Sequence, residues 1–253
     1  MIGVFDSGLG GLSALAPLKD LLPRADLLYL ADTAALPLGE KSDGEITSRL
    51  TRALALFRRE GVSAVLLACG TASSLITEKC KEKFPFPIFD IISPAASAAR
   101  SLPQGTRAVL LCTEAAARTG KFASALARKQ TPIFTLACPA FVRMAESGKA
   151  PSHRAVRRVL APIFPVAPSG VILGCTHFSL LQKEIAAALP GARLFDAAAL
   201  SAAALTARLY GTKAAEGSGE TRFLVTGDAR RFAKSASRVL KYPVTATQVT
   251  FPT

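Results

Sequence analysis

The sequence predicts an α/β fold made of two duplicated halves, each a βαβ-type unit with a parallel sheet. Short apolar runs with the length of buried strands alternate with longer segments that favour helices, which is typical of such units. Two of these runs end in a thiol, 65–68 at Cys69 and 171–174 at Cys175, which are 106 positions apart (175 − 69 = 106). Two further predicted strands repeat with about the same offset. The strand at 2–5 has a counterpart at 108–111, and the strand at 27–30 has a counterpart at 133–136. Three coincidences in one order indicate an internal duplication.

The first half of the chain predicts four strands separated by helices. Its opening strand leads through the glycine-rich turn Asp6–Gly11 into a helix that ends near Pro23, because proline lacks the backbone N–H that a continuing helix needs. A second helix ends at Gly61, a residue type that favours helix C-termini. The other predicted elements are strand 27–30, loop 35–42, helix 43–60, strand 65–68, helix 73–83 and a strand within 85–91.

The second half restarts near Ser93-Pro94 and is followed by a tail that lies outside the duplication. We expect this tail to pack against the first half. The predicted first domain is therefore 1–93 plus 201–253, which contains Cys69, and the second is 94–200, which contains Cys175. The predicted elements are strand 108–111, an alanine-rich helix, strand 133–136, helix 153–164, strand 171–174, an alanine-rich helix after Asp196, a flexible stretch 211–220, strand 223–225 and a basic helix after Asp228.

The composition favours a cytoplasmic protein with reduced thiols. The five cysteines are an odd number, no apolar run approaches the roughly 18–20 residues of a membrane span, and the first residues do not resemble a secretory signal. The formal charge of +13 invites a nucleic-acid partner. The basic residues are spread along the chain, however, and with three tyrosines and no tryptophan there are few aromatic platforms for bases. We interpret the charge as solvated helix faces, with nucleic-acid binding as the alternative.

Two thiols at equivalent positions of duplicated halves suit a reaction on both faces of one carbon. Racemisation of an amino acid is such a reaction, because a base removes the Cα proton on one side and an acid returns a proton on the other. We expect Cys69 and Cys175 to fill these roles, each directly before a helix whose N-terminus lowers the thiol pKa. Without a cofactor, the carbanion depends on the exclusion of water and on fixed hydrogen-bond donors.

Other structural roles compete for the two thiols. They are alternatively small buried core residues, or the two ends of a disulfide. A zinc site that adds His177 to the pair is a third alternative, although the chain has only two histidines. We expect the remaining cysteines, Cys80, Cys112 and Cys138, to be buried core residues.

The first glycine-rich turn has a competing interpretation as a dinucleotide-binding fingerprint. Gly8-Leu9-Gly10 follows a strand and precedes a helix, and Asp32 ends the second strand 24 positions after Gly8 (32 − 8 = 24). Two features disfavour it. Ser13 occupies the place of the third glycine, and the carboxylate of Asp6 would repel a pyrophosphate.

Five short motifs occur in one order along the chain. They are Asp6-Ser7-Gly8-Leu9-Gly10-Gly11, Ala31-Asp32-Thr33 with Pro37-Leu38-Gly39, Ala68-Cys69-Gly70-Thr71-Ala72, Glu146-Ser147-Gly148-Lys149 and Gly174-Cys175-Thr176-His177. As a set they resemble cofactor-independent glutamate racemase over essentially the whole length of the chain. Each motif is short, and the specificity of the resemblance comes from five of them in register.

The resemblance implies two Rossmann-like parallel-sheet domains related by pseudo-two-fold symmetry, with the site between them and neither pyridoxal phosphate nor a metal. It implies that Cys69, assisted by Asp6, acts on one face of the substrate, and that Cys175 acts on the other. His177 and Glu146 would assist Cys175. The implied substrate-binding positions are Asp6, Ser7, Leu38, Gly39, Gly70, Thr71, Thr113, Thr176 and His177.

The activity that the resemblance implies is the racemisation of L-glutamate to D-glutamate for peptidoglycan synthesis, cell wall biogenesis and cell shape, by a cytoplasmic homodimer. The sequence departs from the family at Gly70, where the family has asparagine, at Leu38, where it has tyrosine, and at Ala116, where a second threonine is expected. Two alternatives therefore stand beside it. One is a racemase of another amino acid such as aspartate, and the other is a degenerate relative that binds a partner through its basic surface.

Overall fold

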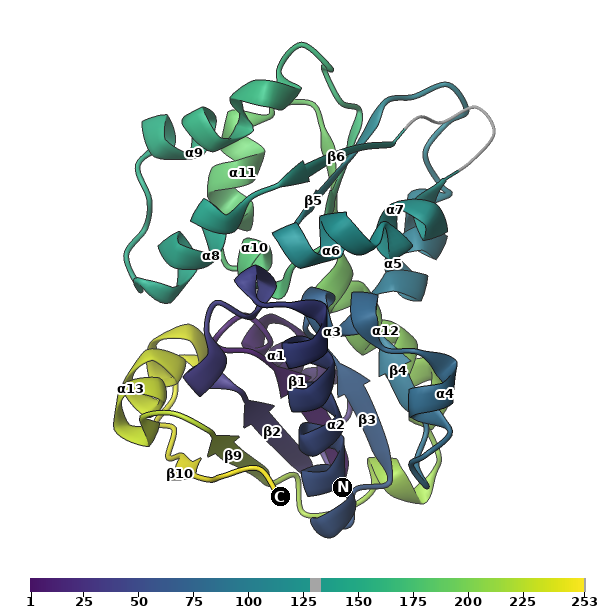
Figure 1. Cartoon of the computed structure of the whole chain (residues 1–253), viewed down its shortest axis with the longest axis vertical. Helices are drawn as coiled ribbons and strands as arrows, with labels where there is room; N and C mark the ends of the chain where they lie inside the picture. The colour runs from purple at the N-terminus through teal and green to yellow at the C-terminus, as the bar shows by residue number, and fades with distance from the viewer. Residues whose placement is uncertain (128–132, 253) are drawn as a thin grey trace.

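Two sheets with exclusively parallel strand pairs organise the computed structural model, which describes residues 1–127 and 133–252. One sheet has six strands in the order β10-β9-β2-β1-β3-β4, and the other has four in the order β6-β5-β7-β8. The six-stranded sheet fills the lower part of Figure 1 and the four-stranded sheet the upper part. The predicted α/β class with two parallel sheets is confirmed.

The strands are short, and those at the centre of each sheet are buried because helices cover both faces of the sheets. The first sheet contains β1 (Ile2–Asp6), β2 (Leu27–Ala31), β3 (Ala64–Leu67), β4 (Ile88–Asp90), β9 (Thr221–Val225) and β10 (Thr247–Gln248). The second contains β5 (Ala108–Cys112), β6 (Ile133–Ala137), β7 (Gly170–Leu173) and β8 (Arg193–Asp196).

Several helices start at side chains that cap their first backbone N–H groups. Ser42 accepts from Glu45 N, Thr113 from Ala116 N and Asp228 from Arg231 N. The helices are α1 (Leu12–Leu21), α2 (Asp43–Arg59), α3 (Gly70–Leu75), α4 (Glu78–Lys81), α5 (Ile92–Ala99), α6 (Glu114–Thr119), α7 (Lys121–Leu126), α8 (Pro139–Glu146), α9 (His153–Leu160), α10 (Thr176–Ser179), α11 (Gln182–Ala188), α12 (Ala197–Leu209) and α13 (Ala229–Leu240). Short 3₁₀ turns occupy Thr33–Ala35, Leu38–Glu40, Ala161–Ile163 and Lys213–Ala215.

The duplication extends to the register of the strand pairs. Ile2 pairs with Leu27 in β2, and Ala108 pairs with Ile133 in β6, so both partners move by 106 (108 − 2 = 133 − 27 = 106). The same shift relates the β3–β4 pairing to the β7–β8 pairing, since Val65 opposite Ile88 becomes Val171 opposite Leu194 (171 − 65 = 194 − 88 = 106). Equivalent residues of the two halves therefore occupy equivalent strand positions.

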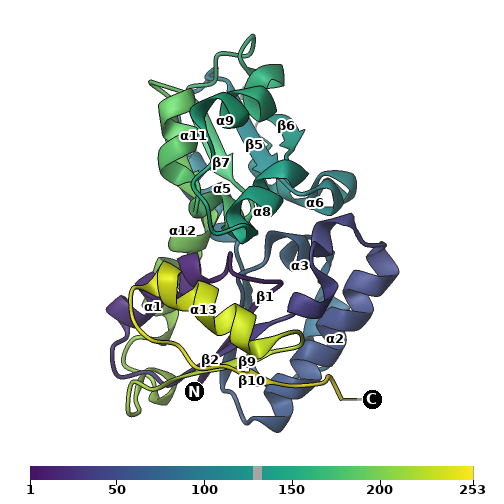
Figure 2. The same cartoon turned by 90° about the vertical axis from the view of Figure 1, so that its left-hand side faces the viewer.

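The tail of the chain returns to the first sheet. β9 pairs in parallel with β2, β10 extends the sheet beyond β9, and α12 packs against α1. Figure 2 shows α13, β9 and β10 beside the N-terminal strands. The division into domains at residues 93 and 200 stays a prediction. Across residues 1–127 and 133–252, no helix combines the length and the apolar composition that crossing a bilayer requires.

Two predicted helices are interrupted in the structure. The helix expected over 73–83 is two helices, α3 and α4, because Ile76 is extended and the Thr77 side chain caps a new start by accepting from Cys80 N. The helix expected over 153–164 ends at Leu160 and continues as a 3₁₀ turn, since Pro162 cannot donate the next helical hydrogen bond.

The structure also contains contacts and elements that the sequence did not indicate. Helices α5 and α8 and strand β8 were not predicted. The stretch 211–220, expected to be flexible, contains a 3₁₀ turn and is tied to Asp26, whose carboxylate accepts from the backbone N–H groups of Ser218 and Glu220. These hydrogen bonds join the stretch to the start of β2.

Candidate functional site

The carboxyl ends of the two sheets meet at the junction between the halves, and each carries a cysteine. Cys69 follows β3 and Cys175 follows β7, and each thiol residue is 4% exposed. The backbones next to the thiols are in contact, because a Cβ added to Gly70 would overlap the carbonyl oxygen of Gly174. The structure therefore brings both thiols to one junction, where a side chain at position 70 would fit only if the halves moved apart.

On the second half, Cys175 belongs to a chain of hydrogen-bonding groups. His177 Nδ1 lies 3.8 Å from Cys175 Sγ, and His177 Nε2 lies 2.6 Å from Glu146 Oε1. The same Glu146 oxygen accepts from Leu9 N at 2.9 Å, which links α8 to the first glycine-rich turn. His177 is 1% exposed and lies in the first turn of α10. His177 and Glu146, both predicted from the motifs, thus form a chain of contacts that starts at the Cys175 sulfur.

The pair formed by His177 and Glu146 is ionised. Burial alone would lower the pKa of His177, but its hydrogen bonds to Cys175 and Glu146 and the charges of Cys175 and Asp6 raise it well above 6.5. Burial would likewise raise the pKa of Glu146, but the hydrogen bond and charge of His177, the Leu9 N–H and the charge of Arg231 lower it below 4.5. The imidazolium therefore faces the sulfur of Cys175.

The surroundings of Cys69 differ from those of Cys175. Its sulfur lies 3.9 Å from the hydroxyl of Ser7, and burial, with the charges of Asp6 and Cys175, raises its pKa to about 12. The expectation that a helix N-terminus lowers this pKa is wrong for Cys69. Helix α3 has only six residues, and burial next to a carboxylate outweighs its dipole.

Asp6 is fully buried and connects the two halves. Its Oδ1 accepts from Gly8 N at 2.8 Å, and its Oδ2 accepts from the Thr176 hydroxyl at 2.9 Å. Burial raises its pKa above 3.8, even though the charge of His177 and these hydrogen bonds act in the opposite direction. The negative charge of Asp6 raises the pKa of Cys69 in the first half and the pKa of His177, the neighbour of Cys175, in the second half.

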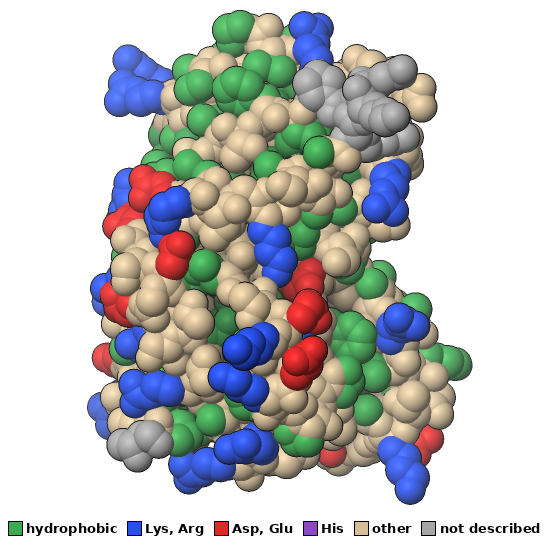
Figure 3. Space-filling model, turned by 45° about the vertical axis from the view of Figure 1, so that its right-hand side comes forward, with side chains coloured by type: hydrophobic (Ala, Val, Ile, Leu, Met, Phe, Trp, Pro, Cys, Tyr) green, Lys and Arg blue, Asp and Glu red, His purple; other side chains and the backbone are tan. Residues whose placement is uncertain are grey.

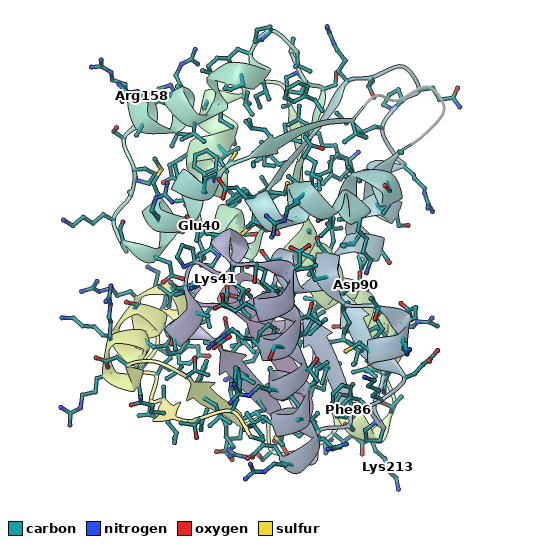
Figure 4. All side chains as sticks on the ribbon, viewed as in Figure 1. Glu40, Lys41, Phe86, Asp90, Arg158 and Lys213 are labelled. Carbon is teal, nitrogen blue, oxygen red and sulfur yellow. The ribbon has the colours of Figure 1, made fainter. Side chains whose placement is uncertain are left out.

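The remaining predicted binding positions surround the same junction. The hydroxyls of Thr71 and Thr113, from opposite halves, are 2.8 Å apart and hydrogen-bonded. Gly39 lies against Thr113, since an added Cβ would be 2.7 Å from the threonine Cβ, and Leu38 beside it is buried. Figure 4 shows the neighbouring Glu40 where the two halves meet. Ser7, Gly70 and Thr176 complete this group, which comes from both halves.

The dinucleotide interpretation is contradicted by two contacts. The Asp32 carboxylate is 0% exposed and receives two hydrogen bonds from the Arg49 guanidinium, at 2.6 and 2.7 Å, and one from Thr226 at 2.7 Å. It has no free face for a ribose. The turn at Gly8 is also covered, because an added Cβ would overlap Glu146 Oε1, so a pyrophosphate has no room there.

All five cysteines are free thiols, and Cys112 and Cys138 are buried as predicted. Cys80 is half-buried rather than buried, because α4 is short and lies at the surface. Among the residues that the structure describes, no group of three or more His, Cys, Asp or Glu side chains is arranged to hold a metal ion. On the face shown in Figure 3, Lys and Arg are scattered over both halves with acidic side chains between them.

Several contacts across the junction had no signal in the sequence. The Lys121 ammonium donates to the carbonyl oxygens of Ser73 and Ile76 at 3.1 and 2.8 Å. Two ion pairs also cross it, Arg118 with Asp43 at 2.5 Å and Arg143 with Glu40 at 2.7 Å. The partners are between 45 and 103 positions apart, so no local spacing indicates them.

Comparison with known proteins places this geometry in context. A model of the Asp/Glu/Hydantoin racemase family matches residues 17–205. Glutamate racemase from Thermus thermophilus is 38% identical over 243 residues, which are 94% of this chain and 91% of the relative. The crystal structure of glutamate racemase from Thermus thermophilus in complex with beta-chloro-D-alanine is similar with a TM-score of 0.86 at 34% identity, covering 98% of this chain and 96% of that one. Escherichia coli glutamate racemase in complex with L-glutamate and the activator UDP-MurNAc-Ala also gives a TM-score of 0.86, at 31% identity and with coverage of 100% and 98%.

Proposed function

The chain belongs to the Asp/Glu/Hydantoin racemase family and is an amino-acid racemase, and from this premise we propose that it interconverts L-glutamate and D-glutamate. The names of its relatives, and the L-glutamate described in the complex from Escherichia coli, support glutamate as the substrate. The resemblance further supports a role of D-glutamate in peptidoglycan synthesis and a cytoplasmic homodimer. Sedimentation of the purified protein tests the dimer.

The observation that carries the proposal is the pair of buried thiols in unequal surroundings. Racemisation requires one group that accepts a proton and one that donates a proton, on opposite faces of the same carbon. Cys175 lies beside the imidazolium of His177, and we assign this sulfur as the base. Burial raises the pKa of Cys69 to about 12, so this sulfur stays protonated and is the acid. One site thus holds a base and an acid.

In the proposed step, the Cα–H bond breaks and its proton moves to the Cys175 sulfur, while the electron pair stays on the substrate as a carbanion. The Cys69 S–H bond then breaks, and its proton forms the new Cα–H bond on the opposite face. Cys175 ends as a thiol and Cys69 as a thiolate, which is the state from which the reverse reaction starts. Asp6, in electrostatic contact with Cys69 and His177, would accept or supply the proton that resets the pair.

The other residues of the junction would hold the substrate and exclude water. Ser7, Thr71, Thr113 and Thr176 place hydroxyl groups around the thiols, and their donors would bind the carboxylates of the substrate. Both sulfurs are almost fully shielded, so charges that develop on the substrate are stabilised by fixed groups rather than by water. Substrate would replace the hydrogen bond that joins Thr71 and Thr113.

The direct test is incubation of the purified protein with L-glutamate, followed by circular dichroism without any added cofactor. We expect the signal to decay to that of the racemate. In deuterated water, mass spectrometry should find one deuterium at Cα of the product. The same measurement with L-aspartate tests the alternative substrate. An absence of exchange with both amino acids would refute the proposed function.

A further inference from the structure

A cavity of about 360 Å³ lies next to the proposed catalytic residues, between α8, α13 and the segment 33–37. Glu146, Leu9, Val142, Arg231 and Phe232 are among its lining residues. In Figure 2, α13 lies below α8, in the lower half of the molecule. Glu146 lines the cavity and contacts His177, which in turn contacts Cys175. A chain of two side chains therefore connects the cavity to the Cys175 sulfur. Its volume falls within the range of small-molecule sites.

The charged groups around the cavity are not equally available to a ligand. The Arg143 guanidinium pairs with Glu40 at 2.7 Å, and the Asp228 carboxylate accepts from the backbone N–H of Arg231 as the cap of α13. Glu146 is engaged by Leu9 N and His177. The Arg231 side chain is exposed and, within the described ranges, makes no hydrogen bond or ion pair. Of the two arginines that line the cavity, Arg143 is paired with Glu40, so the Arg231 guanidinium is the one available to a ligand.

We propose that Arg231 and this cavity form a capture site where the dicarboxylic amino acid first binds, before it passes Glu146 to the thiols. This inference rests on the proposed function. A guanidinium binds a carboxylate through two parallel hydrogen bonds, and the walls formed by Leu9, Val142 and Phe232 suit the methylene groups of the ligand. The net charge of +13 attracts anionic ligands toward the molecule as a whole, and Arg231 supplies a local partner.

The position of Glu146 explains why a capture site is needed. Its Oε1 bonds to Leu9 N and His177 Nε2, and it covers Gly8, so that it closes the floor of the cavity toward Cys175. On the proposed route, a ligand passes from the cavity to the thiols when these contacts open. Arg231 acts on Glu146 electrostatically, since its positive charge helps to lower the pKa of that carboxyl. A carboxylate bound to Arg231 would weaken this attraction and favour the opening.

The test compares Arg231→Met with Arg158→Met, a control that removes one exposed arginine charge from α9, far from the cavity (Figure 4). We expect Arg231→Met to lower kcat/KM about two- to five-fold at low ionic strength with kcat unaltered, and the difference to shrink as salt is added. Arg231→Lys should retain most of the wild-type kcat/KM. Arg158→Met should match the wild type apart from a small effect of net charge.

A binding measurement separates this inference from the proposed function. Calorimetric titration with glutarate, a dicarboxylate without the reacting amino-acid carbon, requires no turnover. Weaker glutarate binding by Arg231→Met than by Arg158→Met supports the capture site even if the wild type does not racemise glutamate. Equal binding and equal kcat/KM in the two variants would overturn it. A fall of kcat at constant KM would also overturn it, because Arg231 would then act through Glu146 on the chemical step.

Discussion

Equivalent residues of the two halves have diverged most clearly beside the thiols. Cys69 and Cys175 are related by the offset of 106, and the same offset relates Thr71 to His177 (177 − 71 = 106) and Asp6 to Cys112 (112 − 6 = 106). The imidazole therefore serves only the Cys175 side, and the carboxyl at the end of β1 has only a thiol as its counterpart. A symmetrical scaffold thus places different side chains beside its two equivalent thiols.

Replacement of either thiol by serine tests whether both sulfurs act on the substrate. We expect Cys69→Ser and Cys175→Ser each to reduce racemisation about 10²- to 10⁴-fold, because a hydroxyl is a far weaker acid and base than a thiol. Cys80→Ser, which changes a half-buried thiol away from the junction, is the matched control and should retain wild-type turnover. Near-normal turnover in either of the first two variants contradicts the two-thiol step.

The raised pKa of His177 predicts a pH-dependent contribution to stability. Since the folded pKa lies well above 6.5, the ionised contacts of His177 stabilise the protein fully below pH 6.5, and this stabilisation is lost as the pH rises through the folded pKa. We expect His177→Gln to lower the free energy of unfolding by about 3 kcal/mol at acidic pH, with a smaller difference from the wild type at alkaline pH. His153→Gln, the change of the exposed second histidine, should show no such trend. Thermal melts across the pH range measure both variants, and a difference that grows with pH would contradict the assignment.

Helix α3 contacts both halves of the molecule. Its N-terminal turn contacts the second half through Thr71 and Thr113, and its C-terminal carbonyl groups accept from Lys121. Carbonyl groups at a helix end have no partner inside the helix, so a lysine from another segment satisfies them and complements the dipole. Because Cys69 immediately precedes α3, these contacts fix the position of the thiol relative to the second half.

Removal of the Lys121 ammonium should loosen α3. We expect Lys121→Met to lower the free energy of unfolding by about 1–3 kcal/mol, and to increase hydrogen exchange in the peptide that contains residues 70–76. The control is Lys213→Met, in a surface turn far from the junction in Figure 4. Equal exchange in this peptide for the two variants would show that Lys121 does not hold the helix.

The contact between Gly70 and Gly174 predicts that a side chain at position 70 separates the halves. In Gly70→Ala the new methyl group would meet a backbone carbonyl, which does not move as a flexible side chain does, and we expect a loss of about 1–3 kcal/mol in urea unfolding. Gly44→Ala is the comparison, because nothing lies within 4 Å of its added Cβ and it belongs to α2. This variant should be neutral or about 0.5 kcal/mol more stable. A neutral Gly70→Ala would mean that the two halves are not held this closely.

The sequence predicted the strands that carry the site better than the helices around them. Apolar runs ending at Cys69 and Cys175 specify buried parallel strands, and a constant offset revealed their equivalence. The break at Ile76 escaped prediction because it depends on Thr77 capping a new helix rather than on a glycine or proline. The environment of Cys69 also escaped prediction, since the spacing of residues carries no information on how deeply a thiol is buried.

The site is assembled from segments spread over most of the chain. The turn after β1, the segment around Gly39, α8 and the ends of β3 and β7 all meet at the junction. Some of the polar contacts that join the halves are exposed ion pairs at the edge of the site, such as Arg118 with Asp43. Exposed pairs of this kind contribute roughly 0–1 kcal/mol each, so they offer little resistance to a local opening of the halves.

An opening of the two halves predicts an order in which the five thiols react. Cys69 and Cys175 are 4% exposed, so iodoacetamide should reach them only when the halves open, whereas the half-buried Cys80 should react first. Cys112 and Cys138, which lie in the core of the second half, should react only on unfolding. Saturating glutamate should protect Cys69 and Cys175 and leave the rate at Cys80 unchanged, because substrate and reagent need the same opening. Mass spectrometry of tryptic peptides gives the five rates separately. Modification of Cys69 and Cys175 as fast as that of Cys80, without protection by glutamate, would show that the thiols are reached without any opening of the halves.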